Sequence, residues 1–254
     1  GWEGMKRGLS YQFTLFERLR DEGTIELMTL EECGKYYRKT YRTTPASAIV
    51  CESDWKAGED HKTVWYCSKN YRINLLTDHD RFRIRDVYLF DDRFSERYQT
   101  ELCTTHDIHF ENLPVIDGNV FTGGGVLAGI YPLSGEREAT FDEMRYEEIA
   151  PDTARVTFLS GGCAIASLTL APNRVEIDGE CAWEYRTGTE SRMPATLLGT
   201  SADRAEFCYR GYTYALTLRQ GRCEGKRLLP QNGKIAVTRG YEVIFAPRIS
   251  AGHT

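Results

Sequence analysis

Apolar residues near the start of the chain recur at helical spacing. Leu9, Phe13, Phe16 and Leu19 follow one another at intervals of three or four residues, so they share one face of a helix. Glycine commonly stands just after the end of a helix, and Gly23 follows this run. We therefore predict an amphipathic helix that ends near Gly23.

A second, shorter helix is predicted a few residues later. Thr29 suits the N-cap position, and Glu32 three residues on completes a capping box. Residues 24–28 between the two helices could form one short strand. Pro45 ends the segment, because the residue before a proline is pushed out of helical geometry. Residues 1–45 are thus predicted to form a helical N-terminal segment.

From residue 46 onward the pattern is typical of β-structure. Short runs of Val, Ile, Thr, Tyr and Phe alternate with Gly, Asp, Asn and Pro, and they predict about nineteen strands. An immunoglobulin-like module uses about seven to nine strands. Residues 46–254 therefore predict an all-β domain, either one large antiparallel β-sandwich or two tandem sandwiches, and we favour the single large sandwich.

Two hairpins follow from the pattern of alternation. A three-residue loop over 178–180 would place Ile177 opposite Cys181 on one apolar face. A two-residue turn at 210–211 would pair Tyr209 with Tyr212, and Phe207 with Tyr214. Both hairpins use only neighbouring residues of the chain.

The run 81–90 changes its parity halfway. Phe82 and Ile84 share a face, but the apolar residues that follow Asp86 have the opposite parity, so a β-bulge is predicted near Asp86. Arg81, Arg83 and Arg85 would line the other face of this strand.

Composition excludes several classes of protein. The chain has 254 residues with 41% hydrophobic residues and a formal charge of −5. Such a chain can bury a core, and its acidity gives no general attraction to nucleic acid or anionic membranes. We therefore expect neither nucleic acid nor a membrane as partner. The first residue is Gly1, which favours a segment cut from a longer product.

Cysteine usage bears on the cellular compartment. Eight cysteines are present, but no CxxC pair occurs, and most lie in apolar runs typical of strands. We expect mostly reduced thiols, which favours a cytoplasmic location.

Few residues carry recognisable chemistry. His106, His109 and Glu111 are the best catalytic candidates, as a histidine and an acidic residue acting as base and acid. On a strand the two histidines would face opposite sides, so we predict no metal site. The glycines at 123–125 lack the spacing of a phosphate-binding loop, and no cofactor is predicted.

Aromatic side chains are the remaining signal. Tyr and Trp can stack on sugar rings while a polar edge binds hydroxyl groups. Trp55 lies in a loop-like run, and Tyr209, Tyr212 and Tyr214 lie on the predicted hairpin. These four residues are the predicted ligand-binding set, provided that they are exposed.

One stretch carries a family resemblance. Leu15-Phe16-Glu17-Arg18-Leu19, followed by Gly23-Thr24-Ile25-Glu26-Leu27-Met28-Thr29-Leu30-Glu31-Glu32, resembles the end of the catalytic barrel in polysaccharide-deacetylase-like proteins and family 57-type glycoside hydrolases. In those proteins a β-sandwich often follows the barrel. The resemblance implies that residues 1–45 end a missing catalytic domain, and no catalytic residue of those families is matched here.

The leading functional hypothesis is therefore a non-catalytic accessory module of a carbohydrate-active protein. Its partner would be carbohydrate or an adjacent catalytic domain. Two alternatives stay open: a stand-alone sugar epimerase, lyase or hydrolase of the large-sandwich type, and a structural or interaction domain without a ligand. An enzyme is the less favoured of these readings for this segment by itself.

Overall fold

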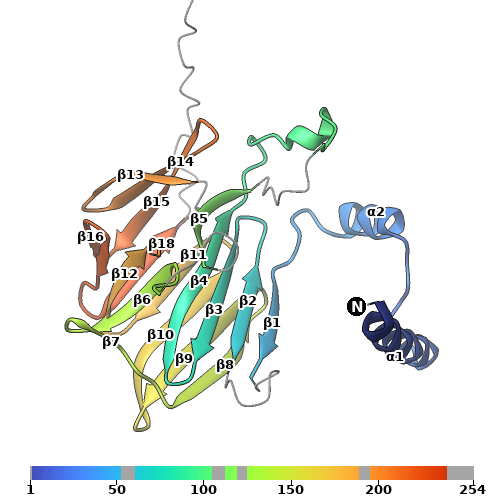
Figure 1. Cartoon of the computed structure of the whole chain (residues 1–254), viewed down its shortest axis with the longest axis horizontal. Helices are drawn as coiled ribbons and strands as arrows, with labels where there is room; N and C mark the ends of the chain where they lie inside the picture. Colours follow the sequence, from blue (N-terminus) through green and yellow to red (C-terminus); the bar gives the residue numbers. More distant parts are fainter. Residues whose placement is uncertain (1, 53–60, 105–111, 119–124, 189–194, 239–254) are drawn as a thin grey trace, which may run out of the picture. The chain divides into compact units, whose positions relative to one another are not determined.

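The structure is a computed structural model that describes residues 2–52, 61–104, 112–118, 125–188 and 195–238. The chain divides into two compact units, residues 1–44 and residues 45–254. The first unit is helical, and the second contains the strands (Figure 1).

The helical unit contains α1 (Trp2–Asp21) and α2 (Leu30–Thr40). The predicted capping box is confirmed: the Glu32 amide donates to the Thr29 hydroxyl at 3.2 Å, and the Glu32 carboxylate accepts from the Thr29 amide at 2.8 Å. The helix predicted before Gly23 is present but begins earlier, at Trp2. Residues 24–28 form no strand, so that prediction was wrong. Neither helix contains a buried residue.

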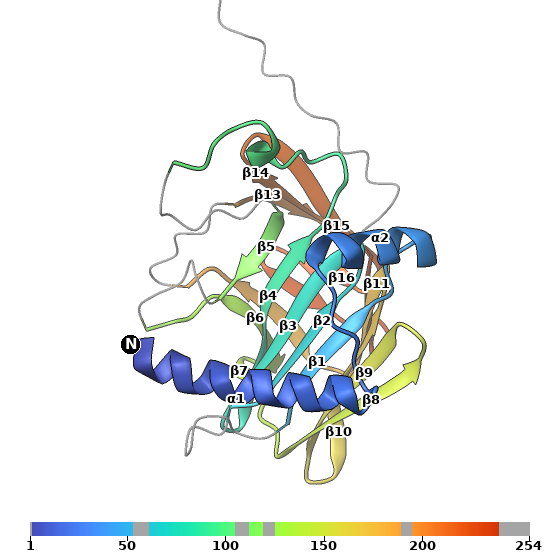
Figure 2. The ribbon, with the colours of Figure 1, turned by 90° about the vertical axis from the view of Figure 1, so that its right-hand side faces the viewer.

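The second unit is built from two antiparallel sheets (Figure 2). Among the described residues, sheet A has ten strands, in the spatial order β1-β2-β3-β4-β6-β12-β17-β16, with β5 beside β4 and β7 beside β6. Their bounds are β1 (Ser47–Cys51), β2 (Thr63–Cys67), β3 (Tyr71–Asp78), β4 (Arg81–Leu89), β5 (Leu113–Asp117), β6 (Gly129–Ser134), β7 (Arg137–Glu138), β12 (Ala182–Arg186), β16 (Arg222–Glu224) and β17 (Arg227–Leu229).

Sheet B has eight strands in the part of the chain that is described, in the order β13-β14-β15-β18-β11-β10-β9-β8. Their bounds are β8 (Glu143–Ala150), β9 (Thr153–Ser160), β10 (Cys163–Ala171), β11 (Arg174–Asp178), β13 (Thr196–Ser201), β14 (Arg204–Tyr209), β15 (Tyr212–Gln220) and β18 (Lys234–Thr238). The last strand, β18, lies in the interior of this sheet, between β15 and β11. A short 3-10 helix, η1 (Arg97–Gln99), lies between β4 and β5 along the chain.

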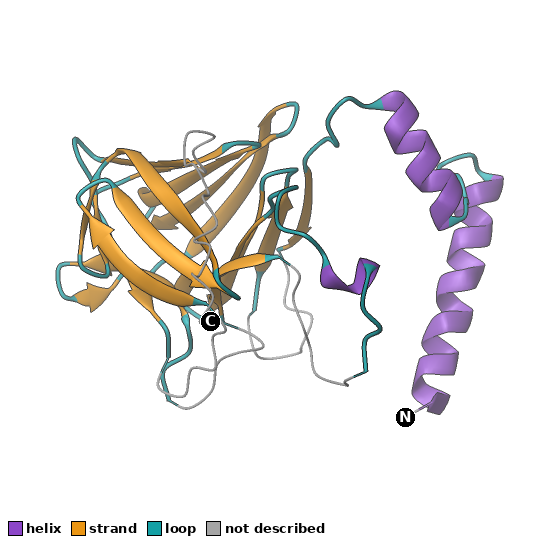
Figure 3. Cartoon of the chain, turned by 90° about the horizontal axis from the view of Figure 1, so that it is seen from above, coloured by secondary structure: helices purple, strands orange, loops and turns teal. Residues whose placement is uncertain are grey.

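The two sheets face each other, as the view along the layers shows (Figure 3). Apolar side chains of both sheets form one continuous core. At its centre Phe82 of β4 stacks on Phe158 of β9, with ring centroids 3.7 Å apart. The fold prediction is confirmed as one large β-sandwich rather than two in tandem, because a single core joins both sheets.

One predicted hairpin is confirmed and the other is wrong. Tyr209 pairs with Tyr212 and Phe207 pairs with Tyr214, as the alternation indicated. The strands on either side of residues 178–180 do not pair with each other: β11 joins sheet B and β12 joins sheet A. Gly179 between them has φ +139°, and a Cβ there would lie 2.6 Å from the Ile165 carbonyl oxygen. The chain therefore crosses from one sheet to the other at this glycine.

The predicted bulge in β4 is confirmed. Asn74 pairs with Asp86 and Leu75 pairs with Ile84, which leaves Arg85 as the extra residue. The bulge keeps apolar residues on the core side along the whole strand, although their parity changes.

Two further features of the described chain bear on the sequence predictions. None of the eight cysteines forms a disulfide in this structure. In the described segments we find no helix with the length and apolar character needed to cross a bilayer.

Candidate functional site

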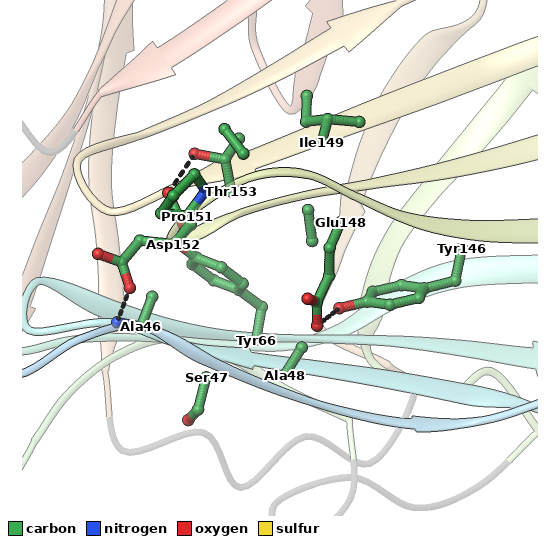
Figure 4. A pocket seen from close by; sticks show the side chains of 12 residues that line it. Ala46, Ser47, Ala48, Tyr66, Tyr146, Glu148, Ile149, Pro151, Asp152 and Thr153 are labelled. Carbon is green, nitrogen blue, oxygen red and sulfur yellow. Dashed lines mark hydrogen bonds between the residues drawn. The ribbon is translucent and has the colours of Figure 1, made fainter.

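A cavity lies along one open side of the sandwich, where edge strand β1 of sheet A approaches edge strand β8 of sheet B (Figure 4). Its volume is about 470 Å³. We call it the edge cleft, and it is lined by Ala46, Ser47, Ala48, Tyr66, Tyr146, Glu148, Ile149, Ala150, Pro151, Asp152, Thr153 and Ala154.

Two hydrogen bonds fix one end of the edge cleft. The Ala46 amide donates to the Asp152 carboxylate at 2.8 Å, and the buried Tyr66 hydroxyl donates to the Asp152 carbonyl oxygen at 2.6 Å. Asp152 adopts a positive φ of 61° in the β8–β9 turn, a conformation that Asp tolerates better than most residues. The turn of sheet B is thereby held against the start of β1 in sheet A (Figure 4).

Beside this cleft, residues 47–50 of strand β1 have one edge that pairs with no other strand of the described chain, and we call it the bare edge. Within the described residues β1 pairs only with β2, so its other edge lies outside the ladder. Its sequence, Ser-Ala-Ile-Val-Cys, contains no charge and no proline, and Ile49 is 71% exposed. Native edge strands are usually protected by charges, prolines or bulges, so β1 is an available template for another strand.

The opposite wall of the edge cleft is polar. Tyr146 and Glu148 lie on β8, and the Tyr146 hydroxyl donates to the Glu148 carboxylate at 3.3 Å. Burial and the nearby Glu148 charge raise the pKa of Tyr146. Glu148 and Asp152 are the two charged groups in the lining of the cleft, and both are acidic. One side of the cleft is thus formed by the uncharged strand β1, and the other side carries the negative charges of Glu148 and Asp152.

A second polar site lies on sheet A, on the face opposite to the core. Asp86 of β4 and Asp117 of β5 are neighbours in the ladder, and each is 2% exposed. The Asp86 carboxylate accepts from Arg85 at 2.8 Å and from the Gly118 amide at 3.1 Å. The Tyr88 hydroxyl donates to Asp117. All of these oxygens serve partners of the fold itself, which favours a structural role for the pair.

The pH dependence of stability tests this carboxylate pair. Burial raises the pKa of Asp86 to about 6, although Arg85 opposes the shift. An acid with a raised folded-state pKa contributes stability that is lost as pH rises through that pKa. Between pH 8 and pH 5 the wild type should therefore gain about 1.4 kcal/mol in its free energy of unfolding that Asp86→Asn does not gain. Urea unfolding measures this, and parallel pH curves for the two proteins would contradict it.

The sequence candidates for catalysis lie away from the edge cleft in the sequence. The described residues contain no group of three or more His, Cys, Asp or Glu side chains placed to hold a metal ion. The catalytic candidates His106, His109 and Glu111 lie outside the described residues, and so does Trp55.

The three hairpin tyrosines do not form an exposed aromatic strip. Tyr214 is 0% exposed and Tyr209 is 6% exposed, both within the core, and Tyr212 is half-buried. Phe94 covers the hairpin, with its ring centroid 5.3 Å from that of Tyr212. The hairpin has the predicted register, and this register directs the rings of Tyr209 and Tyr214 into the core. The expectation that these two rings are available to a ligand was therefore wrong.

The residues of the edge cleft were not identified from the sequence. Ser47, Ala48 and Ile149 carry no motif, and their role depends on which strands end each sheet. The uncharged run at 47–51 was the one available signal, because edge strands rarely lack a charge.

Comparisons with known proteins give a likeness of fold only. No protein-family model and no curated protein matches the chain. Three solved structures are similar, all of the insertase YidC: the active insertase with its first transmembrane domain resolved (11% identity, TM-score 0.42), YidC from Thermotoga maritima (12%, 0.41), and the periplasmic domain of Thermotoga maritima YidC (13%, 0.43). The matches cover 82%, 78% and 76% of this chain.

The chain spans about half the length of the first two of these structures, 44% and 51%, and 85% of the periplasmic domain. The predicted accessory module of a carbohydrate-active protein, with carbohydrate or an adjacent catalytic domain as partner, is wrong. The structures that this chain resembles are insertase chains, and none is a deacetylase, a glycoside hydrolase or another carbohydrate-active protein.

Proposed function

We propose that this chain is a non-enzymatic polypeptide-binding domain. It binds an extended segment of a partner protein that pairs with the bare edge of β1 and places alternate side chains in the edge cleft. The observation that carries this proposal is the uncharged edge of β1 beside a cavity of about 470 Å³. Addition of a strand to a sheet edge is a recurrent mode of peptide recognition.

The geometry of the cleft supports an extended ligand. Main-chain hydrogen bonds to β1 would supply affinity without regard to sequence. Side chains of a paired strand alternate between two faces, so every second one would point toward the space between the sheets. The hydrogen bonds at Asp152 hold β1 and the β8–β9 turn together, so the cleft is formed before a ligand binds.

Charge selects among such segments. Because Glu148 and Asp152 are both acidic, the cleft attracts a segment that carries basic residues among apolar ones. An acidic segment of the same length would be repelled. The preferred partner is therefore an extended segment with alternating β-branched and basic residues.

A synthetic peptide tests this proposal. We expect the amidated hexapeptide Val-Lys-Val-Thr-Val-Lys to shift the backbone NMR signals of residues 47–51, and the version with Glu in place of Lys to bind more weakly. Ile49→Lys should weaken binding about tenfold, because it adds a like charge and removes an apolar contact on the edge strand.

Leu198→Lys is the matched control. Leu198 is 52% exposed and lies on β13, the edge strand at the other end of sheet B. Its substitution should change the affinity by less than about twofold. Equal losses in the two variants, or signal shifts confined to other strands, would contradict a site on β1.

A further inference from the structure

A second cavity lies on sheet A, away from the edge cleft. It has a volume of about 240 Å³ and is lined from β3, β4, β6, β7 and β12 and from the segment before β6. Three arginines line it, Arg81, Arg83 and Arg186, together with the two acidic residues Asp78 and Glu138. We call this cavity the arginine pocket.

Arg83 has an unusual environment in this pocket. The residue is 7% exposed, and its Nε is buried without a hydrogen-bond partner. In the described part of the chain the Arg83 guanidinium makes no ion pair and donates no hydrogen bond. A buried charge without a counter-ion is costly, and one explanation for such a group is a bound ion or ligand that completes it.

The surrounding fold holds the Arg83 side chain in place. Gly129 leaves room for its stem, since a Cβ at that position would lie 2.7 Å from the Arg83 Cδ. The Tyr131 ring is also close, with the guanidinium carbon 5.8 Å from the ring centroid. The guanidinium is therefore positioned by packing rather than by a counter-ion.

The other two arginines already have partners. Glu138 accepts hydrogen bonds from both Arg81 and Arg186. Burial alone would raise the pKa of Glu138, but the hydrogen bonds from Arg186 and Arg81 outweigh it and hold that pKa below its usual value. Glu138 therefore stays ionised, and the formal charge of the lining is three positive groups against two negative ones, or +1.

These features define the ligand. A charge of +1 suits a monoanion, whereas a dianionic phosphate would be repelled by Asp78 and Glu138. A carboxylate matches the planar fork of a guanidinium. Three apolar residues complete the lining, namely Leu76, Val126 and Leu127. We propose that the arginine pocket binds the carboxylate of a ligand that carries a small branched apolar group, with Arg83 as its counter-ion.

Two sources offer this chemistry: a free short-chain carboxylic acid and the C-terminal carboxylate of a polypeptide. Isovalerate and N-acetyl-leucine are the two probes, and N-acetyl-leucinamide is the neutral control. Titration should show both acids, or N-acetyl-leucine alone, binding at millimolar concentration. The first result indicates that a free acid suffices, and the second indicates a peptide terminus. Binding of the amide as tight as that of the acid, or tighter binding of inorganic phosphate, overturns the proposal.

Arg83→Met separates binding from folding. We expect it to weaken binding of N-acetyl-leucine at least about tenfold, and to raise the Tm of the free protein by a few degrees because it removes an unpartnered buried charge. Arg222→Met is the matched control, since Arg222 lies in the same sheet, is exposed and pairs with Glu224. Unchanged affinity in Arg83→Met overturns the proposal.

A measurement on the wild type does not depend on how the variant folds. The ¹⁵N signal of the Arg83 side-chain Nε–H should shift as N-acetyl-leucine saturates the protein, because this donor gains an acceptor. A signal that does not move at saturation places the carboxylate elsewhere and overturns the proposal.

Discussion

Phe158→Ala is expected to lower the free energy of unfolding by about 4 kcal/mol, the cost typical of removing a fully buried aromatic ring. Phe158 is 0% exposed, and its ring stacks on Phe82 at 3.7 Å and meets the edge of Phe141 at 5.3 Å. The stack joins β9 of sheet B to β4 of sheet A, so the cavity would open at the contact between the two sheets. Such a site relaxes poorly, because strands on both sides hold it open.

Urea unfolding followed by tryptophan fluorescence measures this loss. Leu198→Ala is the control, since Leu198 is 52% exposed and its truncation should change stability by less than about 0.5 kcal/mol. A loss below about 2 kcal/mol for Phe158→Ala would show that the two sheets close over the cavity.

Gly118→Ala is expected to cost about 3 kcal/mol. A Cβ at this position would lie 2.3 Å from the Ala128 carbonyl oxygen and 2.9 Å from the Arg85 Cγ. Because the closest atom belongs to the backbone, the segment after β5 must move away from residue 128. That movement also threatens the hydrogen bond from the Gly118 amide to Asp86.

Gly199→Ala separates this clash from a general effect of glycine replacement. No atom lies within 4 Å of a Cβ at position 199, on edge strand β13. The variant should be neutral or more stable by up to about 0.5 kcal/mol, since alanine has fewer unfolded conformations to lose. Equal stabilities for the two variants, measured by thermal unfolding, would mean that residue 128 yields without cost.

Features fixed by neighbouring residues could be predicted from the sequence. The Thr29–Glu32 capping box and the Tyr209–Tyr212 pairing each depend on residues within a few positions of one another. The bulge at Arg85 was visible as a change of parity along a single strand. Such local patterns can be interpreted without knowing how the rest of the chain folds.

Features that depend on distant strands could not be predicted. Ile177 and Cys181 are both buried, so alternation alone made them look like opposite residues of one hairpin, although β11 and β12 belong to different sheets. The edge position of β1 depends on how all the strands of sheet A are ordered. The isolation of Arg83 likewise depends on Glu138 being occupied by two other arginines. The edge cleft and the arginine pocket could therefore be identified only from the three-dimensional structure.

The place of β18 has a consequence for synthesis on the ribosome. Residues 234–238 lie between β15 and β11, and β18 is the strand through which the β13–β15 and β8–β11 parts of sheet B are paired. A nascent chain that ends before residue 234 can form each part separately but leaves two sheet edges unfilled. The sheet therefore becomes continuous only after residues 234–238 have been synthesised, and until then the growing polypeptide exposes a gap the width of one strand.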